Sequence, residues 1–408
     1  MPLLDRVKKT VRRVKDSVAH HQERHRPSGF QFALFDSVAM ARPDHWDSLT
    51  AGESVYFSRK YLEVLEANAP ANLRMHYALI YRDGQPVGAV VAQAVEVRGD
   101  AVPRPDIPKA ARTSLSRVKQ RILVCGNLLS WGFHGVAFAK ETDPSEVWPA
   151  VAEALYRIRR ADKLFGETGL VLIKDLGEEV DANAGPLSRF NYRPLETEPN
   201  MVFHVDSKWA SFEDYVKDLR SGYRNSVKKV MKDFGEGGFT LEPLDAEGVK
   251  AHQDHIHELY HQVHDQQKLR LISLNPDFIP ALAKTFGADF RTRIAHGPDG
   301  NIVGFITTLK DQEGAVGYYI GFDKETAAKG APIYLRLLQC TIQDAIEMKA
   351  KWLSLGRTAL QPKAQLGAQP VPLRCYVRHR VPTMNAVVRS FLNFMPEPDT
   401  APERNPFK

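Results

Sequence analysis

Residues 291–323 read RTRIAHGPDGNIVGFITTLKDQEGAVGYYIGFD. Three runs rich in Ile, Val, Thr, Phe and Tyr are separated by short turns, the first of which is Pro298-Asp299-Gly300. β-Branched and aromatic residues favour strands, and Asp followed by Gly favours a tight reversal of the chain. The stretch therefore predicts an antiparallel meander of three strands over 291–297, 301–311 and 314–323.

The segments on either side of the meander alternate between helical and strand periodicity. Their pattern predicts strands at 239–244, 351–356 and 371–379, helices at 211–234, 251–267, 276–286 and 333–348, and a polar loop at 356–367. The first half loosely repeats this order, with strands at 30–35, 121–126, 131–139 and 169–176, helices at 58–68 and 144–162, and a hairpin over 75–97 that turns at Asp83-Gly84. Helices that alternate with strands and antiparallel hairpins in this way predict an α/β fold with mixed sheets.

A chain of 408 residues exceeds the size at which a single core stops growing. We therefore predict two tandem units, an N-terminal domain over 29–200 and a C-terminal catalytic domain over 201–395. A basic segment, 1–28, precedes them and a tail, 396–408, follows.

No apolar run reaches the roughly 20 residues that cross a bilayer, and no apolar signal-peptide core is present, so we expect a cytoplasmic protein. The three cysteines form no CxxC pair, which disfavours a disulfide framework or a zinc ribbon.

Residues 1–28 contain eight Lys or Arg and three acidic residues, so this segment carries most of the net charge of +6 of the whole chain. Beneath the basic face, Leu4, Val7, Val11, Val14 and Val18 recur at helical spacing. One interpretation is an amphipathic helix in contact with the anionic inner membrane. The other is a helix docked on the protein itself, or a frayed tail. A second basic run, 217–232, also indicates an anionic partner such as phosphate, a lipid headgroup or RNA.

Several motifs carry a resemblance to a known family. They are WASFEDYVKDLRSGYRNSVKKVMKDF (209–234), IVGFITTLKD (302–311), GYYIGFD (317–323) and GRTALQPKAQLGAQPVPLRCYVRHR (356–380). In these the chain resembles the Fem-like branch of the GNAT superfamily, with two GNAT-like domains in tandem. Some members use aminoacyl-tRNA to build peptidoglycan. Others are acyl-CoA-dependent N-acyltransferases, including bacterial ceramide synthases that acylate a long-chain sphingoid amine.

The resemblance implies a binding site for acyl-CoA as co-substrate. Its pantetheine arm would run along the third strand of the meander, at Tyr319, Ile320 and Gly321, where a backbone N–H would also bind the oxyanion. The pyrophosphate would lie at Lys329 and Gly330, before the helix that follows. The family's phosphate loop is degenerate here, because 327–332 keeps one glycine, so an ordinary strand-to-helix loop is the alternative. In the loop 356–367, Arg357 is the candidate for phosphate or an acceptor headgroup, whereas Lys363 is expected on a solvated surface.

Amide formation from a thioester needs a base for the amine and an acid for the thiolate. Helix 251–267 carries five histidines, and His261 and His264 are the candidate bases, with a solvated face as the alternative. We predict no metal site, since no HExxH motif or Cys or Asp cluster accompanies them. His134 is a second candidate base if the two domains face one another. Tyr319 is the candidate acid.

The leading hypothesis is an acyl-CoA-dependent N-acyltransferase whose acceptor is the primary amine of a lipid-like molecule, with a sphingoid base as the specific candidate. Aminoacyl-tRNA-dependent transfer to a cell-wall precursor is the alternative enzyme, in which the basic helix would contact the RNA backbone. A binding module without catalysis, which keeps the fold for lipid or partner recognition, is the third hypothesis.

Overall fold

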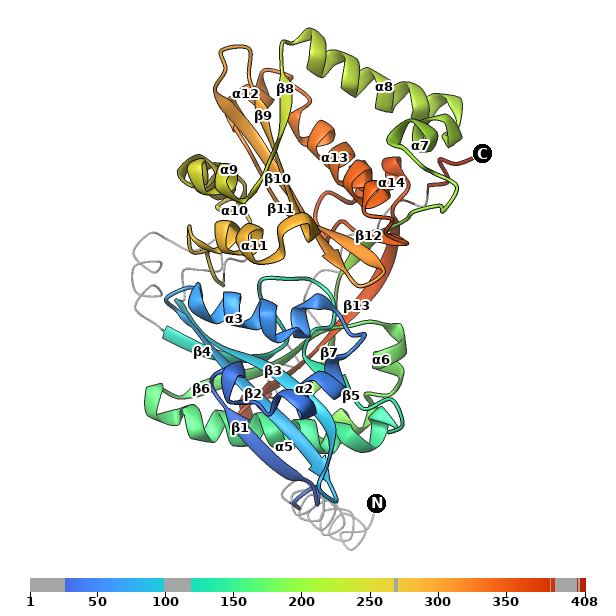
Figure 1. The fold of residues 1–408 in the computed structure, drawn as a ribbon. Coiled ribbons are helices and arrows are strands. Elements are labelled where there is room, and N and C mark those ends of the chain that lie inside the picture. The colour runs from blue at the N-terminus through green and yellow to red at the C-terminus, as the bar shows by residue number, and fades with distance from the viewer. Residues whose placement is uncertain (1–25, 99–118, 268–270, 382, 386–401, 403) are drawn as a thin grey trace, which may run out of the picture.

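The computed structural model describes residues 26–98, 119–267, 271–381, 383–385, 402 and 404–408. The basic segment predicted at 1–28 therefore lies almost entirely outside the described residues, as does most of the tail predicted at 396–408. The described strands form one mixed sheet with helices on both faces (Figure 1), which confirms the predicted α/β class. Along the sheet the strands follow the order β1-β2-β3-β4-β6-β13-β7-β12-β11-β10-β9-β8, and β5 pairs with β3.

In its described residues, the front half, up to β6 and the turns after it, contains six strands and the helices that pack on them. Its strands are β1 (Gln31–Phe35), β2 (Leu73–Arg82), β3 (Gln85–Arg98), β4 (Lys119–Cys125), β5 (Val136–Phe138) and β6 (Thr168–Leu176). Its helices are η1 (Val38–Met40), α2 (Pro43–Thr50), η2 (Val55–Phe57), α3 (Arg59–Ala67), α5 (Pro144–Ala161), η3 (Asp162–Phe165), α6 (Glu178–Ala182) and η4 (Gly185–Phe190).

The rear half begins with the long strand β7 and includes the predicted meander. Its strands are β7 (Arg193–His204), β8 (Thr240–Leu244), β9 (Phe290–His296), β10 (Ile302–Asp311), β11 (Gly314–Phe322), β12 (Trp352–Ser354) and β13 (Gln369–His379). Its helices are α7 (Phe212–Asp218), α8 (Ser221–Glu236), α9 (Ala246–Ala251), α10 (Gln253–His264), α11 (Phe278–Phe286), η5 (Gly287–Asp289), α12 (Lys324–Ala328), α13 (Ile333–Glu347) and α14 (Leu360–Leu366).

Strands β7 and β13 join the halves into one sheet. The last strand, β13, lies between β6 of the front half and β7, and both pairings are antiparallel. Its first residue pairs with Val202 of β7, whereas Val377 near its end pairs with Leu172 of β6. The boundary predicted at 200/201 falls inside β7, and the sheet continues through it.

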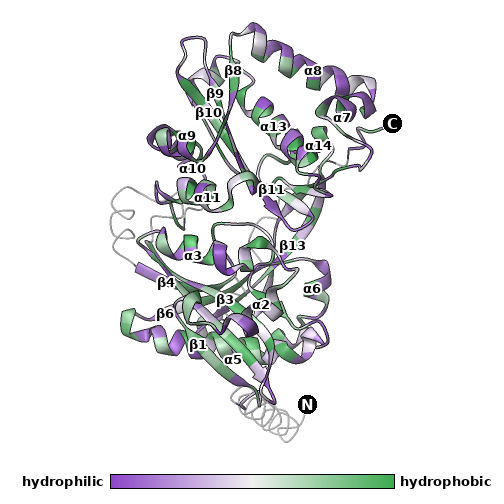
Figure 2. Cartoon of the chain, viewed as in Figure 1, coloured by the Kyte–Doolittle hydropathy of each residue, from purple (hydrophilic) through white to green (hydrophobic). Residues whose placement is uncertain are grey.

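The helices make two layers on this sheet. In the front half α5 packs on one face while α2 and α3 cover the other, and in the rear half α13 packs on one face while α9 to α11 lie on the other. The core under α3 continues without a break into the core under α10 and α11. Helices α3 and α11 are in contact, so this face holds the two halves together. Figure 2 shows the apolar residues concentrated in the strands, with the outer face of α8 hydrophilic.

The structure corrects four of the predicted elements. The basic helix predicted at 211–234 is two helices, because Leu219 adopts an extended conformation between α7 and α8. The helix predicted at 251–267 begins at Gln253, after a break at His252 that ends α9. Only β5 forms within the strand predicted at 131–139. The polar loop predicted at 356–367 contains α14.

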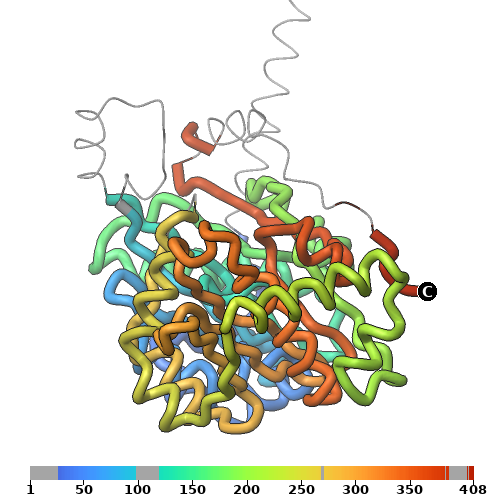
Figure 3. Tube along the Cα trace, turned by 90° about the horizontal axis from the view of Figure 1, so that it is seen from above, coloured from blue at the N-terminus to red at the C-terminus, as the bar shows by residue number. Residues whose placement is uncertain are grey.

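The final described residues return to the body of the protein. Phe407 pairs with Leu219 in an isolated bridge and packs among Phe203, Trp209 and Tyr215, and Figure 3 shows this end beside α7. The three cysteines are buried and unpaired. Within the described part of the chain, every helix is too short or too polar to cross a membrane.

Candidate active site

The site begins where two neighbouring strands separate. Strands β11 and β12 are parallel but pair only at Ala315 with Leu353 and at Val316 with Ser354. Beyond this point β11 continues beside β10, whereas β12 ends and Gly356, with φ +75°, turns the chain away. The divergence opens a cavity of about 590 Å³ between the strands. A volume of this size accommodates a cofactor or a drug-sized ligand.

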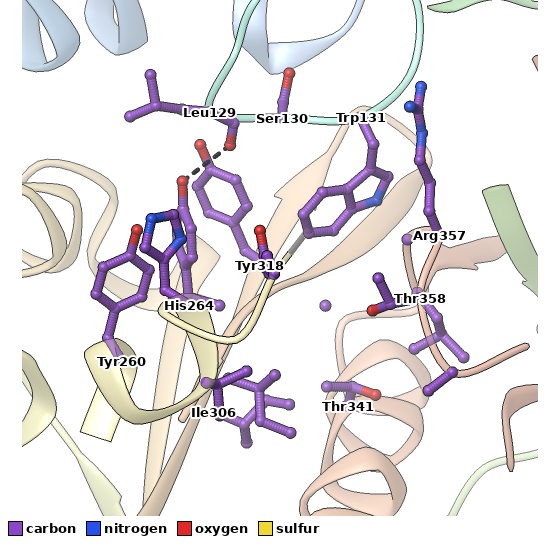
Figure 4. A pocket seen from close by; sticks show the side chains of 18 of the residues that line it. Leu129, Ser130, Trp131, Tyr260, His264, Ile306, Tyr318, Thr341, Arg357 and Thr358 are labelled. Carbon is purple, nitrogen blue, oxygen red and sulfur yellow. Dashed lines mark hydrogen bonds between the residues drawn. The ribbon is translucent and has the colours of Figure 1, made fainter. Parts of the chain in front are cut away.

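Segments of both halves form the cavity wall (Figure 4). The front half supplies the loop after β4 and Lys174 of β6, and the rear half supplies β10 with β11, the end of α10, α13, and the turn before α14. The apolar lining includes Leu128, Leu129, Ile272, Leu274, Ile306, Ile320, Phe322, Leu338 and Leu355. The polar lining includes Ser130, Tyr260, His264, Tyr318, Tyr319, Thr341, Arg357, Thr358 and Lys363.

Two glycines of β11 shape this space. A Cβ on Gly317 would lie 3.2 Å from Cγ2 of Thr341, so the glycine keeps the floor of the cavity open. A Cβ on Gly321 would lie 2.5 Å from the backbone of Leu259, so this glycine lets α10 approach the strand. Gly321, predicted to contact pantetheine, therefore acts through packing and does not line the cavity.

The loop 127–134 of the front half is fixed above the cavity by buried hydrogen bonds. The amide of Gln93 donates to Asn127 Oδ1 at 3.2 Å and accepts from the Leu128 N–H at 2.7 Å. Asn127 donates in turn to the hydroxyl of Tyr61, which lies 2.7 Å from the hydroxyl of Tyr318 on β11. Because each buried polar group has a partner, this chain of bonds holds the loop in one position against the rear half.

Tyr319 connects β11 to the same loop. Its hydroxyl donates to the carbonyl of Leu129 at 3.0 Å, and burial raises its pKa well above the usual range. Its backbone N–H donates to Thr307 Oγ1 at 2.9 Å, at a bulge in the β10–β11 pairing. The predicted residues Tyr319 and Ile320 therefore line the cavity, but the N–H of Tyr319 is directed to Thr307 and not to a ligand.

A second set of contacts joins the loop to the turn after β12. Trp131 donates from Nε1 to Ser354 Oγ at 2.9 Å, and Ser354 donates to Asn200 Oδ1 at the same distance. Asn200 also accepts the N–H of Gly356 at 3.1 Å. The turn that bends the chain away from β11 is therefore braced from β7 and from the front half.

A buried ion cluster lies behind this turn. Asp175 is fully buried and pairs with both Lys174 and Arg357, and it accepts the N–H of Gly132 at 3.1 Å. Although burial acts to raise the pKa of Asp175, the two cations outweigh it and lower the pKa. For Lys174, burial and the nearby Arg357 lower the pKa. Arg357, predicted to bind phosphate, lines the cavity with its guanidinium held by Asp175, so it also links the two halves.

Lys363 is the unexpected member of the site. It lies on α14 with an exposed fraction of 4%, lines the cavity, and donates from Nζ to the Gly356 carbonyl at 3.2 Å. Burial lowers its pKa to about 7, opposed in part by Glu198. The expectation of a solvated Lys363 is wrong, because α14 turns it inward. A lysine that is partly neutral near pH 7 is chemically suited to accept a proton.

The two histidines predicted as bases have different surroundings. His264 is buried, lines the cavity, stacks on Tyr260 at 4.9 Å and lies 3.3 Å from the hydroxyl of Ser273. His261 lies outside the cavity wall on a more exposed part of α10, near Asp265 and 3.2 Å from His257. Of the pair, the structure brings His264 alone to the cavity.

The remaining predicted residues lie away from the cavity wall. His134 is buried behind the loop, with Nδ1 2.8 Å from Ser130 Oγ and its ring on Tyr56. Burial, reinforced by Lys174, lowers its pKa to about 3, so its imidazole is neutral at physiological pH. Lys329 and Gly330 are exposed in the turn before α13 and do not line the cavity. The described residues contain no cluster of His, Cys, Asp or Glu suited to a metal ion.

Comparison with known proteins agrees with this geometry. Residues 217–364 match the model of the acetyltransferase (GNAT) domain. A tandem GNAT protein from the clavulanic acid biosynthesis pathway is similar over 86% of this chain and 99% of its own, with a TM-score of 0.50 and 11% identity. The chain has a GNAT-type fold. The matched segment contains the meander, α13, the separating strands β11 and β12, and Lys363.

Two further solved structures are similar at a lower level. The C-terminal domain of a putative lysylphosphatidylglycerol synthetase from Agrobacterium fabrum is similar over 86% of this chain and 95% of its own, with a TM-score of 0.49 and 10% identity. FemX is similar over 84% of this chain and 96% of its own, with a TM-score of 0.48 and 10% identity. A search of curated protein sequences gives no match. At these identities the likeness concerns the fold.

Proposed function

We propose that the protein is an N-acyltransferase that moves a long-chain acyl group from acyl-CoA to the primary amine of a lipid-like acceptor. The observation that carries the proposal is the cavity at the divergence of β11 and β12, within the segment that matches the GNAT domain. Its wall combines apolar side chains with polar groups on two sides, Tyr260 and His264 on one and Arg357 and Thr358 on the other. Such a wall suits a ligand with a long apolar part and one reactive centre.

The proposed reaction needs two proton transfers. The amine nitrogen attacks the thioester carbonyl, the C–N bond forms and the C–S bond breaks. The amine proton passes to a base, and the protonated base then returns a proton to the leaving thiolate. Lys363 is the base that the geometry favours, because its amine lies in the cavity wall with a pKa of about 7. His264 is the second candidate, since it lies in the same wall on α10.

The acceptor is proposed from the character of the wall. Leu128 from the loop after β4, and Ile272 and Leu274 from the loop after α10, add apolar side chains to the lining. An amine with a long hydrocarbon chain would bury that chain there, at about 0.8 kcal/mol for each CH₂ group removed from water. A sphingoid base has this form and is the acceptor that we propose.

The test has a binding arm and a chemical arm. Thermal denaturation with CoA, with a long-chain acyl-CoA and with tRNA compares the donors, and a ligand at 100 times its Kd adds about 2.7 kcal/mol of apparent stability. Mass spectrometry of mixtures of acyl-CoA and a sphingoid amine then detects the amide. Stabilisation by acyl-CoA together with amide formation supports the proposal. Stabilisation by tRNA and by no CoA species would instead favour aminoacyl transfer.

The basic helix gives the tRNA alternative little support. In α8, Lys229 pairs with Asp233, and Lys232 lies 3.6 Å from Glu236, so that part of the positive charge is compensated within the helix. Counterion release on an RNA backbone depends on cations that are free to replace counterions. The acyl-CoA donor is therefore the one that we propose.

A further inference from the structure

One edge of the front-half sheet gathers the ends of several strands. The antiparallel and parallel registers bring the starts of β2, β4 and β6 together with the ends of β3 and β13. Basic side chains occupy this edge, at the start of β2 and β4 and at the end of β13. They are Arg74, Lys119, Arg121, Arg378 and Arg380. The pairing of strands distant in sequence therefore builds one positively charged rim.

The connection between α5 and β6 lies at the same edge. In Figure 1 the start of β4 and the end of α5 lie together at one side of the lower half. Asp162, the first residue of η3, anchors the connection through Arg121 at 2.6 Å. The same helix ends in Leu164 and Phe165, which are 93% and 57% exposed. Two adjacent large apolar side chains therefore project into solvent from an anchored turn.

Basic side chains lie beside this apolar tip. The guanidinium carbon of Arg74 lies 3.4 Å from the centre of the Phe165 ring, and Lys163 immediately precedes Leu164 with its side chain 70% exposed. Burial and the repulsion of Arg378 and Arg380 lower the pKa of Arg159 at the end of α5. Glu96, Asp162 and Glu167 pair with some of these basic groups, and the basic groups outnumber them.

We propose that this rim is a docking surface for an anionic phospholipid bilayer, with Leu164 and Phe165 entering the headgroup layer. Cations beside exposed apolar side chains are the combination that binds the interface of an anionic membrane, where each basic residue near the surface contributes about 1 kcal/mol. RNA would also attract the cations. RNA has no apolar layer in which an aliphatic side chain such as that of Leu164 could be buried, so the exposed Leu164 favours a lipid bilayer over RNA as the partner.

The rim also adjoins the cavity. The side-chain amide of Asn72, immediately before β2, donates to the carbonyls of Glu96 and Leu271, each at 2.9 Å. Leu271 precedes Ile272, which lines the cavity. A bilayer on the rim would thus lie beside the loop that contributes Ile272 and Leu274 to the cavity wall, and an amphiphilic acceptor drawn from the bilayer would have a short path to the site. This consequence rests on the proposed function, whereas membrane docking itself does not.

Vesicle co-sedimentation of the full chain tests the docking surface. The double variant Leu164→Ser with Phe165→Ser is compared with the parent on phosphatidylglycerol-containing vesicles and on phosphatidylcholine vesicles. We expect parent binding to the anionic vesicles alone, and about a tenfold weaker partition of the double variant, from the loss of two inserted side chains. Met40→Ser, at a residue that is 68% exposed elsewhere, is the matched control and should bind as the parent does.

A second pair of variants tests the charges. Lys119→Gln with Lys163→Gln, at two exposed lysines of the rim, should weaken vesicle binding and reduce its salt sensitivity, whereas Lys228→Gln with Lys229→Gln on α8 should change neither. Full vesicle binding by the Leu164 and Phe165 double variant overturns the proposal, and so does a loss of tRNA binding in that variant with vesicle binding intact. Acylation in detergent solution tests the proposed function separately. All three double variants should retain it, because none of these residues lines the cavity.

Discussion

Replacing Lys363 with methionine removes a charge from the cavity wall while keeping the length and apolar stem of the side chain. Lys363 is 4% exposed, and burial lowers its pKa from 10.5 to about 7. Each unit by which the pKa is lowered corresponds to about 1.36 kcal/mol, so keeping the protonated amine buried costs about 4–5 kcal/mol. We therefore expect the methionine variant to be more stable than the parent at pH 6–7, by up to that amount less the hydrogen bond to Gly356.

The sign of the pH dependence follows from linkage. Between the folded pKa near 7 and the unfolded pKa near 10.4, the unfolded chain binds one more proton at Lys363 than the folded chain does. Parent stability should therefore rise with pH across this window, by at most about 1.4 kcal/mol per pH unit, relative to the variant. Below pH 7 the difference should be constant. The advantage of the methionine variant should therefore shrink from pH 7 to pH 10.

Urea denaturation of both proteins at a series of pH values measures this difference directly. Lys351→Met, at an exposed lysine paired with Glu313, is the control and should change stability by less than about 0.5 kcal/mol at every pH. If Lys363 is the base, amide formation by the methionine variant should fall by about 10²–10⁴-fold. A pH-independent difference between parent and variant would refute the lowered pKa, and unchanged turnover would refute the catalytic role.

Two further predictions concern the cavity wall. His264→Gln should lower acylation at least tenfold if the imidazole takes part in proton transfer, while His261→Gln, at a residue outside the wall, should retain nearly full turnover; equal turnover in both variants would remove His264 from the reaction. Gly317→Val places a side chain against Thr341 in the cavity floor. It should abolish stabilisation by acyl-CoA in thermal denaturation, and retention of that stabilisation would mean that the donor binds elsewhere.

The sequence predicted the fold best where periodicity was strong. The meander, α5 and the hairpin at Asp83-Gly84 form close to their predicted bounds, because alternation, helical spacing and turn residues act locally. The breaks at Leu219 and His252 were missed, since no proline or strong turn signal marks them. In these places contacts with the rest of the protein decide where a helix ends.

The sequence predicted the parts of the candidate site that depend on local signals and missed those that depend on contacts between distant segments. The strand carrying Tyr319 and Ile320 lines the cavity as expected, since its position follows from the order of elements. The inward position of Lys363 depends on α14 and on the turn at Gly356, which are set by packing against the front half. The surrounding sequence QPKAQLG contained one usable signal, a lysine followed by an apolar residue at helical spacing. That the loop 127–134 lines the cavity could not be predicted, because its position depends on the sheet that joins the two halves.

The position of β13 also has a consequence for how the protein is made. Its partner β6 ends at Leu176, and β13 begins at Gln369, so almost two hundred residues separate strands that lie side by side. Closing a loop of that length before its contacts form is slow. During synthesis on the ribosome, the front sheet would keep an unpaired edge at β6 until β13 emerges. Nascent chains that stop before Gln369 should therefore be sensitive to proteases and bound by chaperones, in the front half as well as in the rear half.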